Sequence, residues 1–108
     1  MRIIAQRTLR KYGASLSGRL DQRAVEVALS SWYREVSRAN WQSSAEVKRL
    51  YATASIISAD RIVFNVKGND HRLVVSVSYR KGIVWIVWIG NHAEYDKIDA
   101  RSVRHVKT

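Results

Sequence analysis

Two short polar clusters contain side chains whose types could act on a phosphodiester. The first cluster spans residues 65–72 and the second spans residues 90–97. Cleavage of RNA without a metal ion needs a base for the 2′-hydroxyl proton, cations for the charge of the phosphorane-like transition state, and an acid for the leaving oxygen. Lysine, arginine, histidine, tyrosine and aspartate can fill these roles, and all of them occur in the two clusters.

In the second cluster, His92 is the best candidate for proton transfer, because histidine titrates near neutral pH. Tyr95 follows three residues later and Asp96 four residues later, so one helical turn would present all three side chains on one side. Asp96 could orient the imidazole or accept a proton. The alternative is that His92 and Asp96 cap a C-terminal helix while Tyr95 packs, and the spacing alone favours this structural interpretation.

In the first cluster, Lys67 and Arg72 flank a hairpin turn. Arg72 would suit bidentate contact with a phosphate, and Lys67 would act as a point charge. Asn65 shares the strand face of Lys67, and Arg61 could extend a track for phosphates. The alternative is a pair of solvated charges at a hairpin tip. We expect His71, in the same stretch, to be an exposed histidine of the turn.

The elements that must position these clusters follow from hydrophobic periodicity. Residues 61–67 and 72–80 alternate apolar and polar side chains, as strands with one wetter face do. Residues 83–89 are apolar on both faces, which predicts an internal strand. Apolar residues at i, i+4, i+7 and i+11 predict an amphipathic helix from Asp21 to about Asn40. The other expected elements are a strand over residues 2–5, a helix over 6–12 that ends before Gly13, and a helix over 43–51 opened by a capping box. This order indicates an α+β fold with helices preceding an antiparallel meander.

The tryptophans could suggest platforms for base stacking. Trp32 lies on the apolar stripe of the long helix, so we expect it in the core. Trp85 and Trp88 should point to opposite faces of one strand, which would leave at most one of them free to stack. We expect both in the core.

Composition limits the classes of partner. The chain has 108 residues and a net charge of +10, which implies nucleic acid, an acidic protein or an anionic membrane surface. It has no cysteine, so it forms no disulfide or thiolate metal site, and neither a metal nor another cofactor is implied. This fits a reducing cytoplasm. The apolar run over 83–89 is too short to cross a membrane. Residues 1–100 read as one domain and residues 101–108 as a basic, frayed tail.

Several spaced motifs resemble the HigB-type toxins of bacterial toxin–antitoxin systems, within the wider RelE/ParE-like toxins. The resemblance covers roughly residues 1–100. It rests on the segments Arg2-Ile-Ile-Ala-Gln-Arg-Thr-Leu, Trp32-Tyr-Arg-Glu-Val, Val63-Phe-Asn-Val-Lys-Gly-Asn69, Arg72-Leu-Val-Val and His92-Ala-Glu-Tyr-Asp-Lys-Ile98.

The resemblance implies a RelE-like fold in which an N-terminal strand and helices pack on a curved antiparallel sheet. It also implies a metal-independent mRNA endoribonuclease that acts on translated messages at the ribosome and is neutralised by a cognate helix-turn-helix antitoxin. Under it, His92, Tyr95, Asp96 and Arg72 would be catalytic, and Asn65, Lys67, Asn69 and Arg61 would contact RNA phosphates. The rival interpretations are a ParE-like toxin that binds a protein without cutting RNA, a nucleic-acid-binding module without catalysis, and a toxin that has lost its activity.

Overall fold

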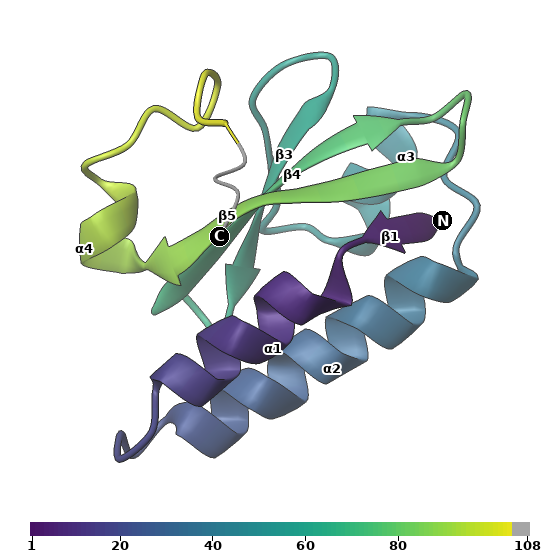
Figure 1. Ribbon diagram of the computed structural model, residues 1–108. Helices are drawn as coiled ribbons and strands as arrows, with labels where there is room; N and C mark the ends of the chain where they lie inside the picture. Colours follow the sequence, from purple (N-terminus) through teal and green to yellow (C-terminus); the bar gives the residue numbers. More distant parts are fainter. Residues whose placement is uncertain (105–108) are drawn as a thin grey trace.

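A twisted five-stranded sheet lies above two long helices in the computed structural model, which describes residues 1–104 (Figure 1). The strand order is β1-β5-β4-β3-β2, so the apolar strand β5 is internal, as the sequence predicts. Strand β1 runs parallel to β5 and the other neighbours are antiparallel, so the expected antiparallel sheet is in fact mixed. The sequence did not indicate the short strand β2. The strands are β1 Arg2–Ile4, β2 Ser55–Ile56, β3 Arg61–Val66, β4 His71–Ser78 and β5 Ile83–Asn91.

The helices α1 and α2 form a hairpin that covers one face of the sheet (Figure 1). The prediction that the first helix ends before Gly13 is wrong. Helix α1 continues through Gly13 to Ser15, and the missing side chain at Gly13 leaves room for Glu26 of α2, whose Cγ would lie 2.8 Å from a Cβ atom there. No helix within residues 1–104 is long and apolar enough to cross a bilayer. The helices are α1 Gln6–Ser15, α2 Gln22–Arg38, α3 Ser44–Leu50 and α4 His92–Tyr95.

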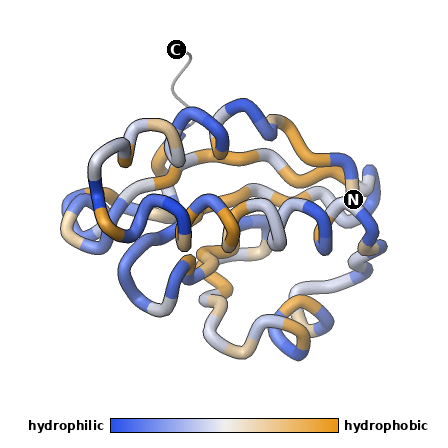
Figure 2. Tube along the Cα trace, turned by 90° about the horizontal axis from the view of Figure 1, so that it is seen from below, coloured by the Kyte–Doolittle hydropathy of each residue, from blue (hydrophilic) through white to orange (hydrophobic). Residues whose placement is uncertain are grey.

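Two hydrophobic cores lie on the two faces of the sheet. The inner core joins the sheet to α1, α2 and α3, and it includes the predicted helical stripe of Val25, Leu29, Trp32 and Val36. The outer core is smaller and lies under the C-terminal segment, with Val63, Val74, Val87 and Ala100 at its centre. Figure 2 shows the hydrophobic positions concentrated along the strands and alternating with hydrophilic ones along the helices. The sheet therefore has apolar contacts on both faces, which fixes its position rigidly.

A β-bulge between β4 and β5 places Trp85 and Trp88 on the same face of the sheet. Val74 pairs with Trp88 whereas Val75 pairs with Ile86, so β5 carries an extra residue at Val87. The prediction that Trp85 and Trp88 point to opposite faces is therefore wrong. Trp88 packs against the outer core, and the register places Trp85 on the same outer face.

The C-terminal segment is held on the outer face by arginines. Arg61 Nη1 donates to the carbonyl of Ala100 at 3.0 Å and to that of Val103 at 2.6 Å. Val103 packs against the outer core, and Arg101 Nη2 donates to Ile57 O at 3.0 Å. Arg101 and Val103, at the start of the tail expected to be frayed, thus contact the body of the protein, and residues 105–108 lie outside the described residues.

Stability is expected to fall at alkaline pH because burial raises the pKa of Tyr12 to about 12 and also raises the pKa values of Tyr51 and Tyr79. An unfolded tyrosine ionises near pH 10. Between that pH and the higher pKa of the folded state, the unfolded chain alone loses these protons, so unfolding becomes more favourable as pH rises. Thermal unfolding from pH 8 to pH 11 should show a falling midpoint. Tyr51→Phe should flatten the decline, and a midpoint independent of pH would contradict the prediction.

Candidate active site

The turn between β3 and β4 holds the first polar cluster. Lys67 and Gly68 have φ values of 51° and 62°, a left-handed pair that reverses the chain tightly. Asn65 pairs with Arg72 across the hairpin, and Asn65 Nδ2 donates to Asn69 Oδ1 at 3.2 Å. The turn therefore places these amide and guanidinium groups at one end of the hairpin.

Helix α4 begins with a capping box that holds the second cluster. Asn91 Oδ1 accepts from the Glu94 amide at 2.8 Å, and Glu94 Oε1 accepts from the Asn91 amide at 2.9 Å. His92 is the first residue of the helix, and its amide donates to Asp70 O at 2.9 Å. This backbone bond ties the second cluster to the turn of the first, although about 20 residues separate them in the sequence.

Arg72 joins the two clusters through its guanidinium group. Nη1 donates to Asn69 O at 2.6 Å and to the carbonyl of His71 at 3.3 Å, and Nη2 lies 3.0 Å from His92 Nδ1. A guanidinium can only donate hydrogen bonds. His92 Nδ1 must therefore carry a lone pair in this arrangement, and the proton of the neutral ring is on Nε2.

Asp96 lies on the other side of the same imidazole. His92 Nε2 and Asp96 Oδ2 are 3.5 Å apart, and the two side chains are 55% and 62% exposed. A polar contact between two side chains this exposed contributes little to stability. It does favour the tautomer with the proton on Nε2, which is also the one that Arg72 requires.

Tyr95 both packs and contacts Arg72, so it fits the structural and the functional interpretation at once. The Arg72 guanidinium carbon lies 5.7 Å from the centroid of the Tyr95 ring. The centroid of the Trp88 ring lies 6.1 Å from that of Tyr95. Trp88 in turn lies over Gly90, where a Cβ atom would be only 2.5 Å from Trp88 Cη2. The sequence analysis did not predict that Trp88 supports Tyr95. The signal in the sequence was Gly90, directly after the apolar run over 83–89.

The two remaining cations differ in position. Lys67 lies in the turn, with Nζ 3.1 Å from Asp70 Oδ2. Arg61 lies opposite Ser76, four residues along β3 from Asn65, and its guanidinium is bonded to carbonyls of the C-terminal segment. The structure thus brings together seven of the residues singled out in the sequence and leaves Arg61 apart from them. The seven are Asn65, Lys67, Asn69, Arg72, His92, Tyr95 and Asp96.

His71 is buried, so the prediction of an exposed turn histidine is wrong. Its side chain is 0% exposed and begins β4 on the inner face, where it contacts Tyr12 and Asp21. The strand starts one residue earlier than the hydrophobic pattern indicates. The partners of His71 lie 59 and 50 residues away, so no local pattern could have identified them.

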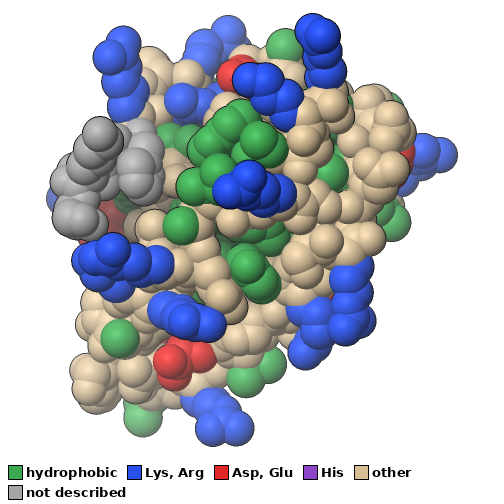
Figure 3. Space-filling view, turned by 45° about the vertical axis from the view of Figure 1, so that its right-hand side comes forward, with side chains coloured by type: hydrophobic (Ala, Val, Ile, Leu, Met, Phe, Trp, Pro, Cys, Tyr) green, Lys and Arg blue, Asp and Glu red, His purple; other side chains and the backbone are tan. Residues whose placement is uncertain are grey.

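The chain carries a net charge of +10, and Lys and Arg side chains are spread over the face shown in Figure 3, which is not the face of the candidate site. Within residues 1–104, no group of three or more His, Cys, Asp or Glu side chains is arranged to hold a metal ion. The chemistry that these residues themselves can provide is proton transfer at His92 beside an arginine that can bind an anion.

Comparison with known families agrees with the fold and with the sequence motifs. The model of the HigB toxin family, described as the RelE-like toxic component of a toxin–antitoxin system, matches residues 25–98. Among curated proteins, none matches this chain significantly. The matched segment runs from α2 to the end of the second polar cluster and so includes every residue of the candidate site. The chain therefore belongs to the HigB toxin family and is the toxic component of a toxin–antitoxin system.

Proposed function

We propose that this toxin is a metal-independent endoribonuclease that cuts messenger RNA. The observation that carries the proposal is the contact between Arg72 Nη2 and His92 Nδ1 at 3.0 Å. It places a fixed cation and a proton acceptor side by side on a surface open to a polymeric substrate. Cleavage of RNA by its own 2′-hydroxyl requires such a pair.

Arg72 would bind the scissile phosphate. Its guanidinium offers donors in a planar fork, which matches two phosphate oxygens better than an ammonium group does. Asn65, Asn69 and Lys67 lie at the same end of the hairpin and would contact the same or the next phosphate. Donors aimed at a pentacoordinate phosphorus stabilise its added negative charge, and each such donor typically contributes about 10²–10³-fold in rate.

His92 would take the proton of the attacking 2′-hydroxyl. When phosphate oxygens replace His92 as partners of Arg72, the lone pair on Nδ1 becomes free to accept that proton. The 2′-oxygen then bonds to phosphorus, the bond to the 5′-oxygen breaks, and a 2′,3′-cyclic phosphate forms. The leaving oxygen needs a proton from a second group, and Tyr95 is our candidate because its ring shares the contact with Arg72.

The substrate would be a message under translation on the ribosome. A charge of +10 favours association with ribosomal RNA and with an acidic partner. We propose that the partner antitoxin is a helix-turn-helix protein that neutralises the toxin in the bacterial cytoplasm. Toxin–antitoxin pairing itself follows from the family.

Induced expression in a bacterial host tests the proposal. We expect the wild type to arrest growth and to leave new cuts inside translated codons, detected by primer extension on an abundant message. His92→Ala and Arg72→Ala should lose both effects, whereas Arg80→Ala, in the turn at the opposite end of the hairpin from Arg72, should keep them.

Other outcomes would contradict the proposal. Growth arrest by all variants without RNA cuts would identify a ParE-like toxin that binds a protein. Absence of growth arrest by the wild type, at confirmed expression, would indicate a binding module or an inactive toxin.

A further inference from the structure

The side chain of His71 is buried together with polar partners that the proposed reaction does not use. Its Nδ1 lies 2.6 Å from the Tyr12 hydroxyl oxygen, and its Nε2 lies 3.0 Å from Asp21 Oδ2. Within residues 1–104, it is the one polar or charged side chain that is buried. Burying an imidazole is unfavourable unless its nitrogens are hydrogen-bonded, and here both are.

The two partners come from different helices. Tyr12 lies in α1, and Asp21 precedes the first residue of α2. Aspartate is a preferred capping residue at that position. However, the Asp21 side chain makes no capping hydrogen bond to α2 and is instead bonded to His71 and to Arg19. The Asp21 carboxylate therefore contacts His71 of the sheet in place of an amide at the start of its own helix.

The protonation of the partners suits this arrangement. The hydrogen bond from His71 lowers the pKa of Asp21; desolvation opposes this effect and the charge of Arg19 adds to it. Burial raises the pKa of Tyr12 to about 12. At neutral pH, Asp21 is therefore an ionised acceptor and Tyr12 a neutral hydroxyl.

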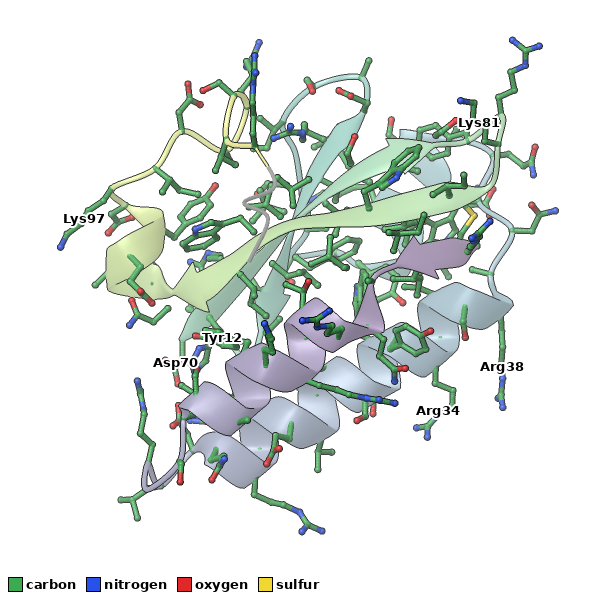
Figure 4. All side chains as sticks on the ribbon, viewed as in Figure 1. Tyr12, Arg34, Arg38, Asp70, Lys81 and Lys97 are labelled. Carbon is green, nitrogen blue, oxygen red and sulfur yellow. The ribbon has the colours of Figure 1, made fainter. Side chains whose placement is uncertain are left out.

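The backbone of His71 lies between the two halves of the site. It pairs with Val66 on β3 and with Asn91 on β5, the residue that caps α4. Its own carbonyl accepts from Arg72 Nη1, and the preceding carbonyl, of Asp70, accepts from the His92 amide. Figure 4 shows Tyr12 on α1 close to Asp70 at this end of the sheet. A displacement of His71 would therefore reach both Arg72 and His92.

We propose that the buried group of Tyr12, His71 and Asp21 positions the site: it ties the helical hairpin to the start of β4 and so holds Arg72 and His92 in their mutual geometry. The expected effect on kcat rests on the proposed ribonuclease function, whereas the positioning role itself does not. Tyr12, His71 and Asp21 are positioning residues, since none of them is expected to touch RNA.

Tyr12→Phe tests the proposal, with Tyr79→Phe as the matched control. Both changes delete one tyrosine hydroxyl, but among residues 1–104 the buried Tyr79 hydroxyl has no hydrogen-bond partner. Well below the unfolding temperature of both variants, Tyr12→Phe should lower kcat for RNA cleavage on the order of tenfold, because misplaced catalytic groups are costly. KM should stay within about twofold, and Tyr79→Phe should match the wild type. A loss of thermal stability in Tyr12→Phe with unchanged kcat would overturn the proposal.

Hydrogen exchange provides a readout that does not depend on catalysis. The His92 amide, bonded to Asp70 O, should exchange at least tenfold faster in Tyr12→Phe than in the wild type. The Val77 amide, bonded to Asp60 O at the other end of β4, should be unchanged. Unchanged protection at His92 would refute the positioning role even if the wild type cuts RNA. Faster exchange at His92 in a chain that cuts no RNA would support the positioning role and reject the proposed function alone.

Discussion

Replacing Arg72 with lysine is expected to lower kcat for RNA cleavage by about 10²-fold although the net charge of the protein is unchanged. Arg72 uses separate nitrogens for the turn carbonyls and for His92, while its guanidinium carbon lies over the Tyr95 ring. A single ammonium group cannot make these contacts in the same geometry. Cleavage of a defined RNA under saturating conditions measures the effect.

Salt dependence separates the charge of Arg72 from its shape. The logarithm of the affinity for single-stranded RNA falls linearly with the logarithm of the salt concentration. Each phosphate that the protein neutralises adds about 0.7 to the magnitude of this slope. Arg72→Lys should keep the wild-type slope, whereas Arg72→Ala should reduce it by about 0.7. Arg80→Lys is the control, since Arg80 is an exposed residue of the turn after β4. Wild-type kcat in Arg72→Lys would mean that only charge matters at this position.

Local sequence patterns were sufficient for the elements that carry the site. The alternation in β3 and β4, the apolar run of β5 and the helical stripe of α2 each reflect burial against one or two neighbouring layers. The polar clusters stand out because they interrupt these patterns at strand ends. The two clusters meet because β4 and β5 are antiparallel, so the end of β5 lies beside the start of β4.

Patterns could not reveal features that depend on distant residues or on an added residue in a strand. His71 looked like a turn residue because its partners are in α1 and before α2. The bulge at Val87 moved Trp88 to the outer face, and no alternation rule includes such a shift. Arg61 was expected to contact phosphates, but its guanidinium is bonded to carbonyls of the C-terminal segment. For His71 and Arg61 the missing information was a tertiary contact, and for Trp88 it was the register shift between β4 and β5.

The bulge also has a consequence for catalysis, since it brings Trp88 over Gly90 and against Tyr95. Gly90→Ala would place a Cβ atom 2.5 Å from Trp88 Cη2 and 2.6 Å from Trp88 Cζ2, far inside van der Waals contact. The indole must move, and we expect the Tyr95 ring, whose centroid lies 6.1 Å from that of Trp88, to shift with it. We expect a loss of about 1–3 kcal/mol in the free energy of unfolding from overpacking. We also expect kcat to fall by more than tenfold, because Tyr95 contacts Arg72.

A second substitution shows whether the indole transmits this effect. Phenylalanine at position 88 is shorter than tryptophan and removes the ring atoms that would meet the new methyl group. Trp88→Phe should therefore restore much of the stability and kcat lost in Gly90→Ala, so that the two changes are strongly non-additive in a double-mutant cycle. Thermal unfolding and single-turnover cleavage of the four proteins measure the coupling. Additive losses would show that Gly90 acts through its own backbone, and Trp88 would then have no part in positioning Tyr95.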